Sequence, residues 1–123
     1  MFYWMARVSK TALLLACLGA ASSGAAEADF FAREVWSKIG AQKCLKCHKL
    51  GGDAEESEFV LLDPAKETDA AAVLKHNRAA FTKMARAAEK DASRLLLKAT
   101  GQLDHEGEEV VVPGSAGFEI LAS

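Results

Sequence analysis

The run Cys44-Leu45-Lys46-Cys47-His48, a C-x-x-C-H pattern, limits what this chain can fold into more than any other feature. Residues three apart on a helical turn face the same way, so both thiols can reach the two vinyl groups on one porphyrin edge. The next residue then places an imidazole beneath the iron. The pattern predicts covalent attachment of one c-type haem through Cys44 and Cys47. His48 is expected to bind the iron, while its other ring nitrogen donates to a backbone carbonyl or similar acceptor.

Three other roles for the cysteine pair stay open at this point. A redox-active dithiol is expected near a βαβ pattern, whereas this chain has mostly helical periodicity. A zinc site takes about four ligands, and beyond the pair the chain offers three histidines and the N-terminal Cys17. A structural disulfide between Cys44 and Cys47 closes too short a loop to stabilise much. The spacing favours haem attachment.

The N-terminal segment has the pattern of an export signal. Two basic residues precede an apolar run over residues 11–21, and small residues with an A-x-A pattern follow at 26–28. The apolar run is shorter than the roughly 20 residues that a membrane-spanning helix needs. We therefore expect a signal peptide over residues 1–28, a single mature domain over 29–123, and a location in the periplasm or at the cell surface.

Cys17 lies within this segment, where the residues before it approximate a lipobox. Membrane attachment is expected only if Cys17 is lipidated, and either route leaves Cys44 and Cys47 as the two cysteines of the folded domain. The formal charge is −2 and no basic cluster is present, so we expect no nucleic-acid partner. A domain this small often depends on a disulfide, metal or cofactor for stability, and a covalent haem would serve.

Hydrophobic periodicity predicts a mainly α domain. We expect a first helix capped by Asp29 and ended or loosened by Gly40, a second over roughly Asp69–Glu89, and a short third over Ala92–Ala99. Ser115 is expected to cap a last helix. The second helix is predicted to bury the stripe Leu74, Phe81, Ala85 and Ala88, with Lys75, Arg78, Lys83 and Arg86 lying away from it. The first helix is expected to pack on the C-terminal helix, with the haem filling the core between them.

The sixth iron position has several candidates. His105 ranks first, because it lies in a polar loop with no apolar reason to hold a histidine. Met84 is the alternative, although its place beside Phe81 also fits core packing. His76 is expected on the solvated face of the second helix. An open position is the remaining option, and the choice matters because a methionine ligand raises the reduction potential relative to two histidines.

Four lysines surround the cysteine motif: Lys38, Lys43, Lys46 and Lys49. They fit a solvated face. They also fit a docking surface near Lys46 and Lys49 that steers an acidic redox partner towards the haem edge, an attraction that salt would weaken.

Beyond the motif, the chain resembles the cytochrome c-like domains that recur in large exported planctomycete proteins. The matching stretches are Lys43–Asp53, Phe59–Pro64, Lys75–Phe81, Ser93–Gly101 and Asp104–Leu121, the last with His105, Gly107 and Pro113–Ser115. Relatives commonly carry an H-G-G-G-like run where this chain has His105-Glu106-Gly107-Glu108, so two glycines are replaced by glutamates. The resemblance implies a small single-haem cytochrome c-like domain with electron transfer outside the cytoplasm.

From the residues together with the resemblance, we expect an electron carrier rather than an enzyme. The alternatives are a haem enzyme or sensor whose open iron position binds peroxide or a gas, and an interaction module in which the haem only stabilises the fold.

Overall fold

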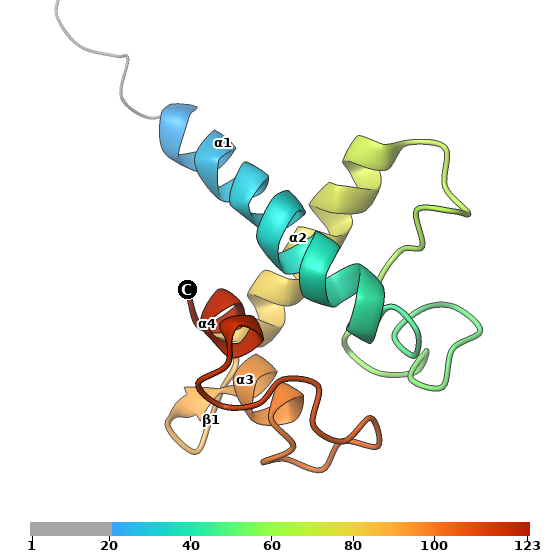
Figure 1. Cartoon of the computed structure of the whole chain (residues 1–123). Helices are drawn as coiled ribbons and strands as arrows, with labels where there is room; N and C mark the ends of the chain where they lie inside the picture. The colour runs from blue at the N-terminus through green and yellow to red at the C-terminus, as the bar shows by residue number, and fades with distance from the viewer. Residues whose placement is uncertain (1–20) are drawn as a thin grey trace, which may run out of the picture.

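The computed structural model describes residues 21–123. Most of the predicted export signal, including Cys17, lies outside the described residues. Within the described part, the chain is mainly helical, with α1 (Ala21–Phe30), η1 (Phe31–Cys44), α2 (Ala70–Arg86), α3 (Arg94–Ala99) and α4 (Ala116–Ala122). In Figure 1, α1 and η1 form one continuous rod that α2 crosses, while α3 and α4 lie together below the crossing. None of the helices described in residues 21–123 is long and apolar enough to cross a membrane.

The first helical rod differs from the expectation at both ends. Asp29 does not cap a helix; it lies inside α1 and forms an ion pair with Arg33 at 3.3 Å. Gly40 does not end the helix either, because η1 continues to Cys44. A Cβ atom at Gly40 would lie 2.5 Å from the Trp36 ring, so the glycine makes room for the indole instead of breaking the helix.

The hydrogen-bonding of η1 explains which of its residues are buried. It is a π-helix, and the Leu45 N–H at its end reaches the carbonyl of Gly40, five residues back, at 2.8 Å. A π-helix turns more slowly than an α-helix, so buried positions recur every four to five residues. The buried residues of η1 are Phe31, Val35, Trp36, Ile39 and Gly40.

In α2 the predicted start is confirmed, since the Asp69 carboxylate accepts from the Ala72 N–H at 3.0 Å. The predicted stripe is partly wrong. The buried residues are Val73, Asn77, Phe81 and Met84. Leu74 is half-buried, and both Ala85 and Ala88 are exposed. These four positions follow helical spacing, but Asn77 is polar, so the sequence did not mark this face as the buried one. Of the four predicted surface cations, Lys75, Lys83 and Arg86 are exposed, and Arg78 is half-buried in an ion pair with Glu27.

After α2 the chain turns back through a two-stranded antiparallel hairpin, β1 (Ala88–Glu89) and β2 (Ala92–Ser93). This hairpin ends α2 at Arg86, before the predicted Glu89, and delays the start of α3 to Arg94. The predicted cap of the last helix is confirmed, because the Ser115 hydroxyl accepts from the Phe118 N–H at 3.2 Å.

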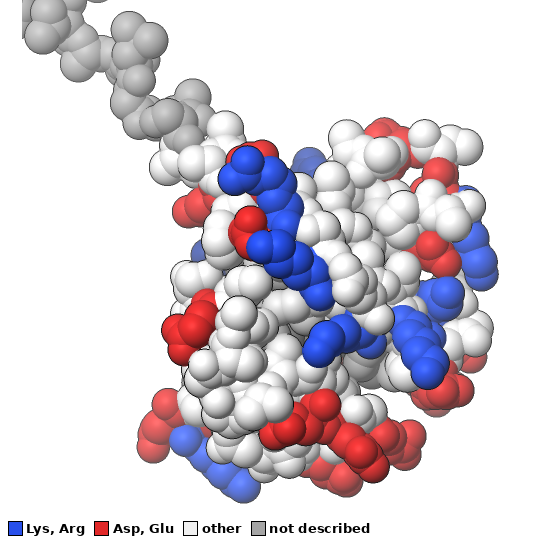
Figure 2. Space-filling view, in the orientation of Figure 1, with Lys and Arg blue, Asp and Glu red and all other residues white. Residues whose placement is uncertain are grey.

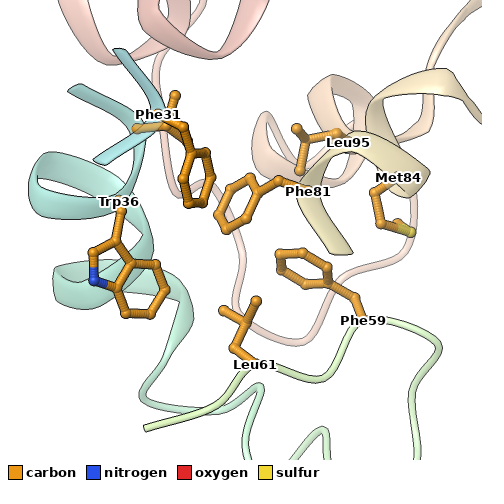
Figure 3. Packing of buried hydrophobic residues seen from close by; sticks show 8 residues of the cluster. Phe31, Trp36, Phe59, Leu61, Phe81, Met84 and Leu95 are labelled. Carbon is orange, nitrogen blue, oxygen red and sulfur yellow. The ribbon is translucent and has the colours of Figure 1, made fainter. Parts of the chain in front are cut away.

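A cluster of aromatic and aliphatic side chains joins η1, α2, α3 and the segment at 59–61, which is neither helix nor strand (Figure 3). Phe81 is its centre, in edge-to-face contact with Phe31 at 5.5 Å and with Phe59 at 5.0 Å between ring centroids. Such pairs contribute about 1 kcal/mol each beyond the area they bury. On α4, Ile120 and Leu121 pack partly buried against this cluster. The expected packing of the first helix on the C-terminal helix is confirmed, because α4 contacts η1.

Candidate functional site

The cysteine motif begins at the last residue of η1 and continues as a tight turn. The Cys47 N–H and the His48 N–H both donate to the Cys44 carbonyl, at 3.2 and 3.0 Å. Cys44 and Cys47 are half-buried and are not bridged to each other. Both line the same cavity as His48. The helical turn expected for the motif is therefore present.

Burial raises the pKa of the Cys44 thiol to about 12; the positive charge of Lys43 opposes this shift, and Cys47 adds to it. At neutral pH, Cys44 is consequently a neutral thiol. Redox-active C-x-x-C pairs instead depend on a cysteine whose pKa is lowered, because the thiolate is the nucleophile. The environment of Cys44 does not favour dithiol exchange.

His48 is fixed by the segment that follows it. Its Nδ1–H donates to the Phe59 carbonyl at 2.9 Å, with the Ser57 hydroxyl at 3.3 Å, so the carbonyl contact expected from the sequence is confirmed. The ring also packs edge-on against Phe59, at 4.9 Å between centroids. Burial lowers the pKa of His48, and nearby His105 adds to the effect, while the bond to Phe59 opposes it. A neutral ring with its proton on Nδ1 presents a lone pair on Nε2.

His105 lies in the loop between α3 and α4 and is held in the same way. Its Nδ1–H donates to the Glu108 carbonyl at 3.0 Å. A Cβ atom at Gly107 would lie 2.9 Å from Cε1 of the imidazole, so the ring position requires a residue without a side chain there. Glu108 has a φ of 55°, a left-handed conformation that favours glycine. Glu108 occupies one of the two positions where the resembling family has glycine and this chain has glutamate.

The two histidines, far apart in sequence, lie near each other in the structure with their rings stacked. Their ring centroids are 6.1 Å apart and the ring planes differ by 8°. The carbonyl at each Nδ1 fixes the tautomer that carries the proton on Nδ1 when the ring is neutral, and within residues 21–123 neither Nε2 has a hydrogen-bond partner. Both histidines thus have an Nε2 without a hydrogen-bond partner in the described chain, and their rings lie near each other.

These groups border a cavity of about 1030 Å³. Apolar side chains from four parts of the chain contribute to its wall: Phe59, Met84, Leu95, Ala99 and Leu121. Met84 is both a core residue, 8% exposed, and a wall residue of the cavity. His76 does not line the cavity; it is exposed, with its Nε2 3.1 Å from the Val60 carbonyl.

The four lysines near the motif are mostly engaged. Lys38 pairs with Glu34, Lys49 with Asp63 at 3.1 Å, and Lys43 donates to the Val110 carbonyl at 2.8 Å. Lys46 is exposed and lines the cavity. Figure 2 shows basic side chains in a band across one face, with acidic side chains gathered below it, over the region of α3 and the following loop.

Sequence reasoning missed Asn77, which anchors the backbone of Leu62, three residues beyond Phe59. Its amide oxygen accepts from the Leu62 N–H at 2.8 Å, and its amide nitrogen donates to the Leu62 carbonyl at 3.0 Å. The bonded segment includes Phe59, the acceptor for His48. The sequence signal that could have revealed this role is an asparagine among the apolar positions of a helix, because a buried amide must have hydrogen-bond partners.

Comparison of the chain with models of protein families, with curated proteins and with solved structures finds no match. Within residues 21–123, no group of three or more histidine, cysteine, aspartate or glutamate side chains is arranged to hold a metal ion. The resemblance to cytochrome c-like domains therefore stays a prediction.

Proposed function

We propose that this protein carries one covalent haem c and transfers single electrons; Cys44 and Cys47 would attach the haem, and His48 and His105 would bind its iron. The observation that carries the proposal is the pair of parallel imidazoles beside the C-x-x-C-H turn, each with its Nδ1 bonded to a carbonyl. A haem iron takes four ligands from the porphyrin, so one or two side chains complete it. No larger cluster of ligands is needed.

The spacing of the two rings fits this assignment. Imidazole nitrogens bind metals at about 2 Å, and a ring centroid lies about 1 Å beyond its nitrogen, so two imidazoles on opposite sides of one metal have centroids about 6 Å apart. The rings of His48 and His105 are 6.1 Å apart. Their carbonyl partners would fix both ring planes and increase the basicity of both ligands.

The cavity also fits a large, mainly apolar group. Its volume of about 1030 Å³ lies just above the range for small-molecule sites, about 300–1,000 Å³. Aromatic, thioether and aliphatic side chains in its wall suit a porphyrin face, and the two thiols in the wall suit its vinyl edge.

Two axial histidines favour an electron carrier over a peroxidase or a gas sensor. The bound haem supplies a single-electron couple, and the chain's own residues determine what else can reach it. With His48 and His105 both bound, no position is left for peroxide or a gas. Removing His105 would open one.

Covalent attachment is tested by producing the full chain in a host with haem c maturation and measuring haem that stays on the denatured polypeptide. The wild type is expected to retain haem, and the Cys44→Ser/Cys47→Ser variant is expected to lose it. Cys17→Ser is the matched control, because it removes the third cysteine of the chain and should keep the haem. A wild type without bound haem would overturn the proposal.

The axial assignment is tested with two further variants. His105→Ala is expected to become high-spin and, when reduced, to bind carbon monoxide. Met84→Ala is the control that removes the other candidate ligand from the same cavity wall, and it should stay low-spin and indifferent to carbon monoxide. The reverse pattern would assign the sixth position to Met84.

The proposal also places the carrier outside the cytoplasm with a protein redox partner. Export rests on the N-terminal pattern of residues 1–28, and docking rests on Lys46, the exposed lysine of the motif turn, with Lys49 beside it. Lys46→Glu is expected to slow electron exchange with an acidic partner at low salt and to have little effect at high salt. An equal loss at both salt concentrations would argue against electrostatic docking.

A further inference from the structure

Arg94, the first residue of α3, lines the cavity and forms ion pairs with Glu58 and Glu89, but its side chain makes no hydrogen bond within the described residues. Its Nε atom is buried and has no hydrogen-bond partner within the described chain. Glu89 Oε2 lies 3.6 Å from Nε, and Glu58 Oε2 lies 3.7 Å from Nη1. Both distances exceed the 2.7–3.2 Å or so of a hydrogen bond. A guanidinium offers five donors in a planar fork, and a buried donor left unpaired is unfavourable.

The other cations that line the cavity are placed differently. Lys43 donates to the Val110 carbonyl, and Lys98 donates to the Asp104 carbonyl. Lys46 belongs to the cysteine turn itself. Among the cations that line the cavity, Arg94 therefore differs in two ways: it lies outside the cysteine turn, and its buried Nε has no hydrogen-bond partner in the described chain.

The chemistry of haem indicates what such a cation would meet. Its two vinyl groups lie on adjacent pyrrole rings, and its two propionates lie on the other two rings. When the thiols bind the vinyl edge, the carboxylates lie at the far edge of the macrocycle, away from Cys44 and Cys47. Six acidic side chains line the cavity and would repel those carboxylates: Asp53, Glu56, Glu58, Asp104, Glu106 and Glu109. A cation with free donors is needed there.

Building on the proposed function, we propose that Arg94 binds a propionate carboxylate of the haem and thereby fixes the end of the macrocycle opposite the cysteines. A planar guanidinium can hold a carboxylate through two parallel hydrogen bonds, which a lysine cannot match. Arg94 is a positioning residue in this scheme. Its positive charge next to the propionate would also raise the reduction potential of the haem.

The test compares Arg94→Gln with Arg86→Gln in the haem-loaded protein. Arg86 undergoes the same chemical change but is exposed, lies outside the cavity wall and has no ion pair within the described residues. Resonance Raman spectra report the propionate bending mode, which shifts when a hydrogen bond to the carboxylate is lost. We expect a shifted mode and a lower reduction potential in Arg94→Gln, partial recovery of both in Arg94→Lys, and wild-type values in Arg86→Gln.

An unshifted propionate mode in Arg94→Gln with haem still attached would overturn this inference and leave the proposed function intact. Absence of covalent haem from the wild type would instead overturn the proposed function. If Arg94→Gln does not accumulate as holoprotein, the wild type decides the question by ¹⁵N-edited NMR of the reduced, low-spin form. The Arg94 Nε–H should exchange slowly with solvent; exchange as fast as that of Arg86 would overturn the inference.

Discussion

Replacing Asn77 with alanine would remove the two hydrogen bonds that anchor the Phe59–Leu62 segment. Asn77 is 0% exposed, and both bonds go to the backbone of Leu62, at 2.8 and 3.0 Å. A buried polar group left without its partner costs about 1–3 kcal/mol. The substitution leaves two backbone groups of Leu62 without a partner. Leu62 is half-buried, so water can replace part of each lost hydrogen bond. We therefore expect the free energy of unfolding to fall by about 3 kcal/mol.

Urea unfolding of the purified protein, followed by circular dichroism, measures this free energy. Gln42→Ala is the matched control: Gln42 is an exposed amide whose one bond goes to the Ser37 carbonyl, and its loss should change stability by less than about 0.5 kcal/mol. A cost below about 1 kcal/mol for Asn77→Ala, with an unchanged dependence on urea, would refute the reasoning.

Three further predictions concern the core and the surface. Gly40→Ala should destabilise the protein by about 1–3 kcal/mol in thermal unfolding, because its Cβ would lie 2.5 Å from the Trp36 ring; a neutral change would contradict the observed packing. Met84→Ala should cost about 2–5 kcal/mol, since the side chain is 8% exposed, and a cost below 1 kcal/mol would count against its core role. A backbone N–H and Lys49 lower the pKa of Asp63, so its stabilising effect is complete above pH about 4 and is lost as the pH falls through the lowered value. The melting temperature of Asp63→Asn should accordingly fall less on acidification than that of the wild type.

Much of the local structure was predictable because it depends on neighbours in sequence. Asp69 and Ser115 cap helices as expected, since a carboxylate or hydroxyl needs only the N–H groups of the next turn. The end of α3 near Gly101 follows from the left-handed φ of 69° at that glycine.

The predictions of helix ends and buried faces were wrong where contacts with other side chains or with distant segments determine the structure. Gly40 carries the signal of a helix end, yet the Trp36 ring occupies the space that a side chain would take, and the helix continues. The buried face of α2 runs through Asn77 because a distant loop supplies partners for its amide. No local pattern reveals either effect.

The candidate site divides in the same way. Cys44, Cys47 and His48 are recognisable because their spacing is local. The place of His105 near His48 depends on how the loop between α3 and α4 folds, and the sequence could only rank His105 among the candidates. The role proposed for Arg94 could not be predicted from the sequence, because only the folded structure shows that its Nε is buried without a hydrogen-bond partner.

The central claim, that His48 and His105 hold one haem iron between them, is tested most directly by near-infrared magnetic circular dichroism of the oxidised, haem-loaded protein. The position of the charge-transfer band distinguishes two histidine ligands from a histidine and a methionine. We predict a low-spin spectrum with the band of bis-histidine coordination. A histidine–methionine band, or a high-spin spectrum of an open iron position, would contradict the account.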